Sequence, residues 1–122
     1  MSLLAGRRVL VVEDEPIIAM CLEDILENLG CTVLGPARTV ADSLRLVEDE
    51  APDLAILDIN LGGERSYDLA ERLTKLSVPF AFASGYSGAP DGFSPETPLI
   101  QKPYREPQVE QILLALTHRA AA

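Results

Sequence analysis

Five short apolar runs, separated by longer amphipathic segments, constrain the fold of this chain more than any other feature. The runs are Val9–Val12, Thr32–Leu34, Leu54–Leu57, Phe80–Ala83 and Leu99–Ile100. The first and third contain no polar residue, and such runs are typical of strands buried on both faces of a parallel sheet. Helices must therefore cover both sides of the predicted sheet.

The segments between the runs carry helix signals. The first helix begins near Pro16 and stops at Gly30, the third is capped near Ser66, and the last begins near Pro107 and frays from Thr117 to the end. The side chains expected to face the core are Ile18, Leu22, Ile25 and Leu29 in the first helix, Val40, Leu44 and Val47 in the second, Leu69, Leu73 and Leu76 in the third, and Val109, Ile112, Leu113 and Leu116 in the last.

The segment between the fourth and fifth runs breaks this regular alternation. Its breakers are Gly85, Gly88, Pro90, Gly92, Pro95 and Pro98. They interrupt any helical period, which predicts that the fourth helix is missing or very short. Alternating strands and helices with short links otherwise predict an α/β fold, a doubly wound five-stranded parallel sheet ordered 2-1-3-4-5, as in flavodoxin.

Length and composition predict one domain over residues 1–122, with a core of about residues 7–118 and no attached output domain. The formal net charge of -9 argues against binding to nucleic acids or anionic membranes. The first apolar run is too short for a signal peptide or a membrane span, so a cytoplasmic protein is expected. Cys21 and Cys31 lack metal-ligand spacing and are predicted to be buried free thiols.

Chemically competent side chains follow four of the predicted strands. Glu13 and Asp14 follow the first strand, Asp58 ends the third, Ser84 ends the fourth and Lys102 ends the fifth. Each of them alone could be an ordinary loop or surface residue. Because the carboxyl ends of parallel strands meet at one sheet edge, the five are expected to converge on one site.

Crowded carboxylates at such an edge call for a cation, and a hard ion such as Mg²⁺ or Mn²⁺ suits oxygen ligands. The expected ligands are Glu13, Asp14, Asp58 and the backbone carbonyl of Asn60. A carboxylate in this setting can attack phosphorus and form an acyl phosphate. We therefore predict Asp58 as the nucleophile, with Lys102 and the Ser84 hydroxyl binding the phosphoryl oxygens.

Together these motifs resemble the receiver domains of response regulators in two-component signalling, from Arg7 to Leu116. The resemblance rests on Val11–Glu15, Pro52–Asp58, Ser84-Gly85 and Lys102-Pro103-Tyr104. It implies that Asp58 is the phosphoacceptor, that Glu13, Asp14 and the Asn60 carbonyl lie at the metal, and that Ser84 and Lys102 contact the phosphoryl group. In such domains the Lys102–Pro103 peptide bond is often cis.

Two positions depart from the usual receiver pattern. Leu99 stands where receivers have an aromatic switch residue, and the segment after Asp58 reads Ile59–Gly63 in place of a Met-Pro-Gly turn. With Phe82–Tyr86, these departures resemble the FAT GUY receivers, in which the fourth helix is often lost. Tyr86 is a candidate for the missing aromatic role, although a simple packing role is equally consistent with the sequence.

The resemblance implies a phosphoacceptor that takes its phosphoryl group from a histidine kinase or phosphotransfer protein. It does not imply an enzyme with an external substrate. Docking of the kinase on the first helix, and of a downstream protein on residues 85–98 and the last helix, is expected. Three alternatives stay open: an interaction module that is never phosphorylated, a phosphohydrolase of the haloacid dehalogenase type, and a nucleotide- or flavin-binding domain. The phosphohydrolase would require an Asp where this chain has Asn60. The nucleotide- or flavin-binding domain would require a glycine-rich loop after the first strand, and this chain has none there.

Overall fold

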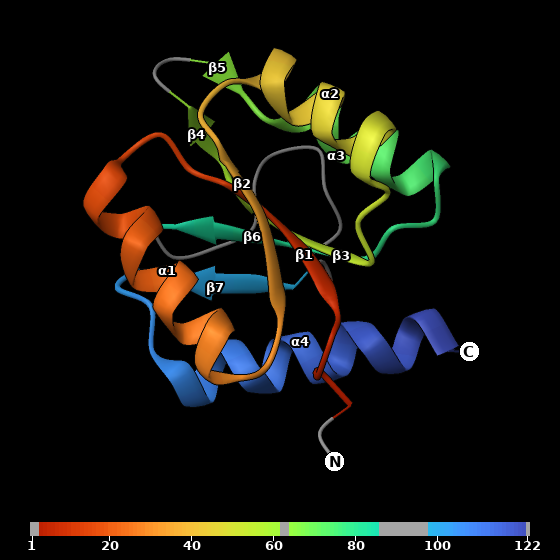
Figure 1. Cartoon of the computed structure of the whole chain (residues 1–122). Helices are drawn as coiled ribbons and strands as arrows, with labels where there is room; N and C mark the ends of the chain where they lie inside the picture. Colours follow the sequence, from red (N-terminus) through yellow and green to blue (C-terminus); the bar gives the residue numbers. More distant parts are fainter. Residues whose placement is uncertain (1–2, 62–63, 86–97, 122) are drawn as a thin grey trace.

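A five-stranded parallel sheet forms the centre of the computed structural model, which describes residues 3–61, 64–85 and 98–121 (Figure 1). Its strands are β1 (Arg8–Val12), β2 (Thr32–Ala37), β3 (Leu54–Asp58), β6 (Phe80–Ser84) and β7 (Leu99–Gln101). They are arranged in the order β2-β1-β3-β6-β7. Since β6 and β7 are the fourth and fifth predicted strands, the predicted order 2-1-3-4-5 is confirmed.

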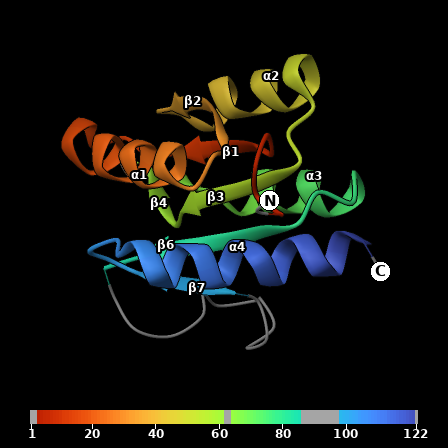
Figure 2. The ribbon, with the colours of Figure 1, turned by 60° about the horizontal axis from the view of Figure 1, so that its bottom comes forward.

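Alternate residues of the central strands divide the core into two layers. In β1, Val9 and Val11 pack in the layer that also holds buried residues of α1 (Pro16–Asn28) and α4 (Glu106–Ala121). Leu10 and Val12 pack in the opposite layer, with α2 (Val40–Glu50) and α3 (Tyr67–Lys75). Figure 2 shows α4 lying along its face of the sheet. Helices therefore cover both faces, as the apolar runs require.

Helix boundaries follow local chemistry in most cases. Pro16 is the first residue of α1, as predicted, and the Thr39 side chain caps α2 by accepting a hydrogen bond of 3.1 Å from the Asp42 amide. Ser66 lies at the cap position of α3, but its side chain makes no capping hydrogen bond. Its hydroxyl instead donates to the Ile59 carbonyl at 3.5 Å, which links the start of α3 to the segment after Asp58.

The ends of two helices differ from the prediction. Leu76 was expected to face the core, but α3 ends at Lys75 and the Leu76 side chain is 43% exposed. The last helix was expected to fray from Thr117, yet α4 continues to Ala121. Thr117 is buried, and its hydroxyl donates to the Leu113 carbonyl at 2.9 Å, because this part of α4 still packs on the sheet.

The two cysteines have different environments. Cys31 is buried, as predicted, but Cys21 is exposed. The prediction for Cys21 was wrong because apolar residues extend around more of α1 than the buried face formed by Ala19, Leu22 and Leu26.

Near the start of the chain, Leu4 is fully buried and packs in the α1 and α4 layer, so the core begins before residue 7.

Two backbone features were not predicted. A two-stranded antiparallel pair, β4 (Asn60–Leu61) with β5 (Glu64–Arg65), follows the central strand β3. The Gly35–Pro36 peptide bond is cis, as is the Lys102–Pro103 bond that the family resemblance had implied. The predicted loss of the fourth helix and the role suggested for Tyr86 fall on residues 86–97, outside the described residues.

Within the part of the chain that the structure describes, no helix combines the length and apolarity needed to cross a membrane.

Candidate functional site

The predicted site residues follow the carboxyl ends of neighbouring strands. Asp58 is the last residue of β3 and lies next to β6, where it pairs in register with Ala83. Ser84, the last residue of β6, accepts a backbone hydrogen bond of 2.8 Å from Lys102. The Glu13 amide donates to the Ala37 carbonyl at 2.9 Å, which anchors the residue that follows β1. Regular sheet pairing thus carries all these residues to one edge.

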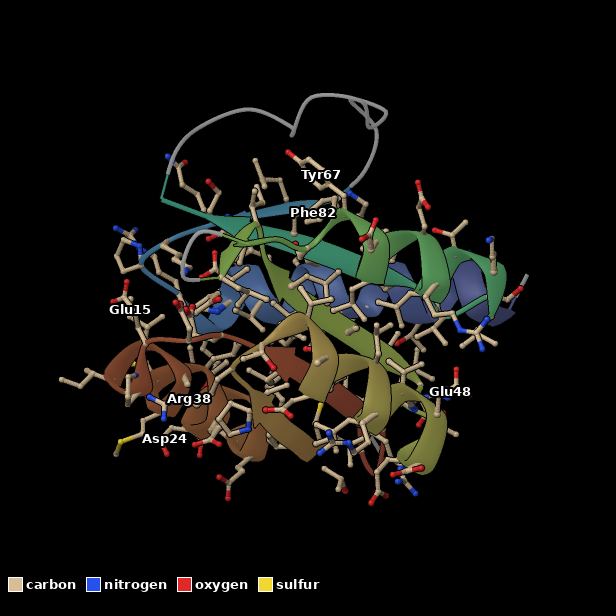
Figure 3. The ribbon with its side chains drawn as sticks, turned by 90° about the horizontal axis from the view of Figure 1, so that it is seen from above. Glu15, Asp24, Arg38, Glu48, Tyr67 and Phe82 are labelled. Atoms are coloured by element: carbon tan, nitrogen blue, oxygen red, sulfur yellow. The ribbon has the colours of Figure 1, made fainter. Side chains whose placement is uncertain are left out.

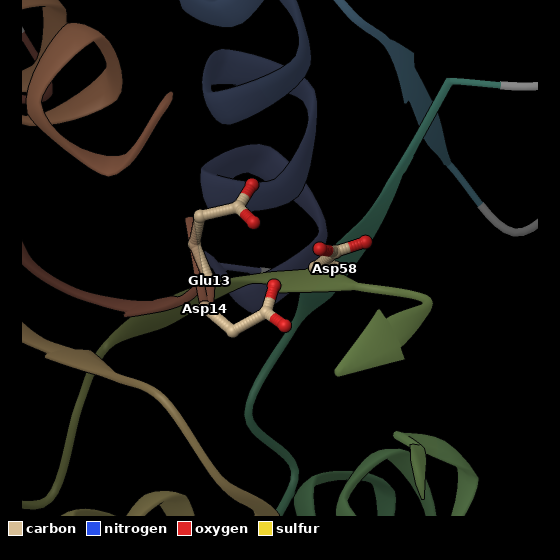
Figure 4. Close-up of side chains that lie close together, drawn as sticks. All are labelled: Glu13, Asp14 and Asp58. Atoms are coloured by element: carbon tan, nitrogen blue, oxygen red, sulfur yellow. The ribbon is translucent and has the colours of Figure 1, made fainter. Parts of the chain in front are cut away.

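Three carboxylates meet at this edge. Glu13, Asp14 and Asp58 each offer an oxygen atom, and these three atoms lie within 4.8 Å of one another (Figure 4). Glu13 is 1% exposed and Asp58 is 7% exposed, whereas Asp14 is partly buried. This acidic triad, Glu13, Asp14 and Asp58, is the cluster predicted from the strand ends.

Lys102 supplies a positive charge to the acidic triad. Its Nζ atom lies 2.7 Å from Glu13 Oε1 and 3.2 Å from Asp58 Oδ2. The lysine side chain is only 14% exposed, so water screens these two ion pairs less than it screens surface pairs. A lysine at this position can therefore neutralise charge that is added to Asp58.

The electrostatics of the site are set by burial and by the close carboxylates. Burial, together with Asp58, raises the pKa of Glu13 from 4.5 to about 7, although Lys102 acts in the opposite direction. For Lys102, burial alone would lower the pKa, but the contacts with Glu13 and Asp58 raise it overall. The lysine therefore stays charged, whereas Glu13 keeps its proton to a higher pH than an exposed glutamate does.

The donor set fits a hard divalent cation. Carboxylate oxygens are the ligands that Mg²⁺ and Mn²⁺ prefer, and the acidic triad offers three within reach of one ion. Glu13 Oε1 is buried and makes no well-directed hydrogen bond with the described residues, although the Lys102 ammonium group lies 2.7 Å from it. A cation at the triad would satisfy this oxygen and offset the repulsion that raises the pKa of Glu13.

Two other predicted residues lie beside the triad. Ser84 is buried at the end of β6, one residue beyond the partner of Asp58. Asn60 begins β4, two residues after Asp58, where its backbone pairs with Arg65. The roles of the Ser84 hydroxyl and the Asn60 carbonyl stay predictions.

The position of the usual aromatic switch holds an apolar side chain in the α2 and α3 layer. Leu99 pairs in register with Phe82 of β6 and is partly buried. Phe82 makes an edge-on ring contact with Tyr67, with centroids 6.5 Å apart (Figure 3), and a second one with Phe80 at 5.4 Å. Aromatic packing near Leu99 therefore comes from β6 and α3.

A cavity of about 550 Å³ opens beside Asp58. It is lined by Glu15, Ile18 and Cys21 at the start of α1, by Asp58 and Gly85, and by Lys102, Pro103 and Tyr104 after β7. No role for Tyr104 was predicted from the sequence, although it is the last residue of the Lys102-Pro103-Tyr104 motif. Cys21 was also missed, but its spacing of three residues from Ile18 places both on one face of α1.

Comparisons with known proteins show the family of this chain. Residues 9–93 match the model of the response regulator receiver domain. The chain is 36% identical over 113 residues to the phyllosphere-induced regulator PhyR of Methylorubrum extorquens, covering 86% of this chain and 41% of PhyR. The chain thus spans less than half the length of that curated relative.

Solved structures of related regulators also match this chain in fold and sequence. The solution structure of SdrG from Sphingomonas melonis Fr1 is 45% identical with a TM-score of 0.80, and the match covers 95% of this chain and 98% of SdrG. The anti-anti-sigma factor PhyR from Bartonella quintana is 27% identical with a TM-score of 0.78, covering 95% of this chain and 50% of that protein. The chain described here therefore belongs to the family of response regulator receiver domains.

Proposed function

We propose that this chain is a phosphoacceptor that takes a phosphoryl group onto Asp58 in the presence of Mg²⁺ and thereby switches its binding to a partner protein. The observation that carries the proposal is the position of Lys102, whose ammonium group lies within 3.2 Å of Asp58 and 2.7 Å of Glu13. Phosphoryl transfer to a carboxylate requires a nucleophilic acid, a nearby positive charge and access for the donor. The buried acids, the paired lysine and the open cavity beside them supply these.

The chemical step is a substitution at phosphorus. An Asp58 carboxylate oxygen forms a bond to the phosphorus of a phosphohistidine, the P–N bond breaks, and the imidazole leaves with a proton from solvent. Lys102 neutralises charge on the transferred phosphoryl oxygens. Bound at the acidic triad and the Asn60 carbonyl, Mg²⁺ or Mn²⁺ would supply further charge neutralisation to the same oxygens.

The switch then depends on groups that respond to the new charge. Ser84 is buried at the end of the neighbouring strand, and its hydroxyl would form a hydrogen bond with the phosphoryl group. Lys102 follows β7 directly, and its backbone donates to Ser84. Movement of either side chain would therefore be passed to the ends of β6 and β7 and to the segment between them.

The alternatives are less well supported. A phosphohydrolase of the haloacid dehalogenase type requires a second Asp two residues after its nucleophile, whereas this chain has Asn60. An interaction module that is never phosphorylated would not require a buried lysine between two buried acids. We therefore propose self-phosphorylation and no turnover of an external substrate, as expected for a signalling protein.

The partners we propose are a histidine kinase or phosphotransfer protein and a downstream protein. The Bartonella quintana relative is an anti-anti-sigma factor, which makes a protein the favoured downstream target. Residues 1–122 would act as a single receiver unit in the cytoplasm, and the net charge of -9 argues against direct binding to nucleic acid. Residues 85–98 and α4 are the surface proposed for the downstream partner.

Intact mass spectrometry after incubation with acetyl phosphate and Mg²⁺ tests the proposal. The wild type should gain the mass of one phosphoryl group, and Asp58→Asn should gain none. Asp53→Asn is a matched control, because Asp53 precedes the same strand at its opposite end. No gain by folded wild-type protein that binds Mg²⁺ would refute phosphorylation and favour the interaction module.

A further inference from the structure

Tyr104 lines the cavity and carries a buried polar group that the proposed mechanism does not use. Its ring packs against the core layer under α1 and α4, which fixes the direction of the phenol. Its hydroxyl is buried and has no hydrogen-bond partner in good geometry among the described residues. A buried hydroxyl without a partner costs free energy, so its presence calls for an explanation.

The same neighbourhood holds a second buried polar atom without a well-directed hydrogen bond, Glu13 Oε1. Burial, the nearby charges of Glu13 and Asp58, and a hydrogen-bonding contact with Glu13 raise the pKa of Tyr104 above its usual range, so the phenol already lies beside the Glu13 carboxylate. A donor and an acceptor that both lack a well-directed hydrogen bond therefore lie close to each other, and Lys102 Nζ lies 2.7 Å from the acceptor.

We propose that Tyr104 is a positioning residue that donates a hydrogen bond to Glu13 once Asp58 carries a phosphoryl group. This inference rests on the proposed function. Added negative charge on Asp58 draws Lys102, now 3.2 Å from Asp58 Oδ2, toward the phosphoryl oxygens and away from Glu13 Oε1. The Tyr104 hydroxyl then takes the place of the lysine at the glutamate and holds that carboxylate in position for the metal.

This role separates the two states of the protein. In the resting state the Tyr104 hydroxyl contacts Glu13 without a well-directed hydrogen bond to any described residue, so it contributes little. In the phosphorylated state it gains a well-directed bond to a charged acceptor, which is stronger than a bond between neutral groups. Tyr104→Phe removes only the hydroxyl and keeps the packing of the ring, so it should affect the second state much more than the first.

Beryllofluoride with Mg²⁺, a non-covalent substitute for the phosphoryl group, provides the test. Calorimetric titration should show that Tyr104→Phe binds beryllofluoride about tenfold more weakly than the wild type, as expected for one hydrogen bond to a charged group. Without metal, the unfolding midpoint of Tyr104→Phe should equal or exceed that of the wild type. Tyr67→Phe is the matched control and should bind beryllofluoride like the wild type.

Absorbance gives a second readout, because the chain has three tyrosines and no tryptophan. A tyrosine difference band should appear on binding in the wild type and in Tyr67→Phe, and be smaller in Tyr104→Phe. Equal affinities, a band of unchanged size in Tyr104→Phe, or weaker binding matched by lost metal-free stability would each overturn the inference. Failure of wild-type protein to bind beryllofluoride would instead refute the proposed function itself, and this inference with it.

Discussion

Replacing Glu13 by Gln should make the metal-free protein more stable at alkaline pH. The folded state raises the pKa of this carboxyl from 4.5 to about 7. A group with a raised pKa contributes stability that is fully present below its unfolded value and is lost as the pH rises through its folded value. Ionising Glu13 therefore weakens the wild type between about pH 4.5 and pH 7, whereas a glutamine does not ionise.

The size of the effect follows from the pKa shift. At about 1.4 kcal/mol per pKa unit, the shift corresponds to an upper limit of roughly 3 kcal/mol. Glu13 is 1% exposed, so screening by water reduces this figure little. The two proteins should have similar stability at about pH 4, and Glu13→Gln should be the more stable by up to roughly 3 kcal/mol at about pH 8.

Urea unfolding of both proteins across this pH range, with chelator present, measures the difference directly. Contributions of the carboxyl groups outside the acidic triad cancel, because the two chains differ only at Glu13. Saturating Mg²⁺ should stabilise the wild type more than Glu13→Gln, since the ion requires an ionised ligand. Parallel pH profiles of the two metal-free proteins, or a wild type that is more stable at alkaline pH, would refute the reasoning.

Three further predictions concern the lysine, the core and the cysteines. Lys102→Met should lower metal-free stability at neutral pH by roughly 1–3 kcal/mol, because it leaves Glu13 and Asp58 buried without a cation; an unchanged urea midpoint would contradict the ion pairing. Leu113→Ala should destabilise by roughly 3 kcal/mol, since Leu113 is fully buried. Ile17→Ala, 77% exposed, is its control and should stay within about 0.5 kcal/mol of the wild type; equal losses would contradict the burial of α4. Alkylation of the folded protein should modify Cys21 and spare Cys31, whose burial also raises its thiol pKa. Mass spectrometry that finds Cys31 modified before unfolding would contradict that burial.

The sheet and the acidic triad could be predicted because both depend on features that are local in the sequence. Apolar runs such as Val9–Val12 specify buried parallel strands, and parallel strands bring their carboxyl ends to one edge. Glu13 and Asp58 were therefore placed together without knowledge of any contact. Lys102 followed from the same argument, but its distances from the two acids depend on tertiary packing.

The features that could not be predicted depend on where a helix ends and on which of its faces packs against the sheet. Cys21 and Leu22 are adjacent on an apolar helix, and only the position of α1 on the sheet decides which of them is buried. Leu76 fits the helical period but lies just past the end of α3. Tyr104 had no signal beyond its place after Lys102-Pro103, because an unpartnered buried hydroxyl is visible only once its surroundings are known.

The central claim, that Asp58 accepts a phosphoryl group, is tested most directly by locating the acyl phosphate in the chain. Protein treated with acetyl phosphate and Mg²⁺ is reduced with borohydride, which converts an aspartyl phosphate to homoserine, and its peptides are sequenced by mass spectrometry. The account predicts homoserine at position 58 alone, and only in samples that contained Mg²⁺. Homoserine at another aspartate, or none in folded protein with bound Mg²⁺, would contradict it.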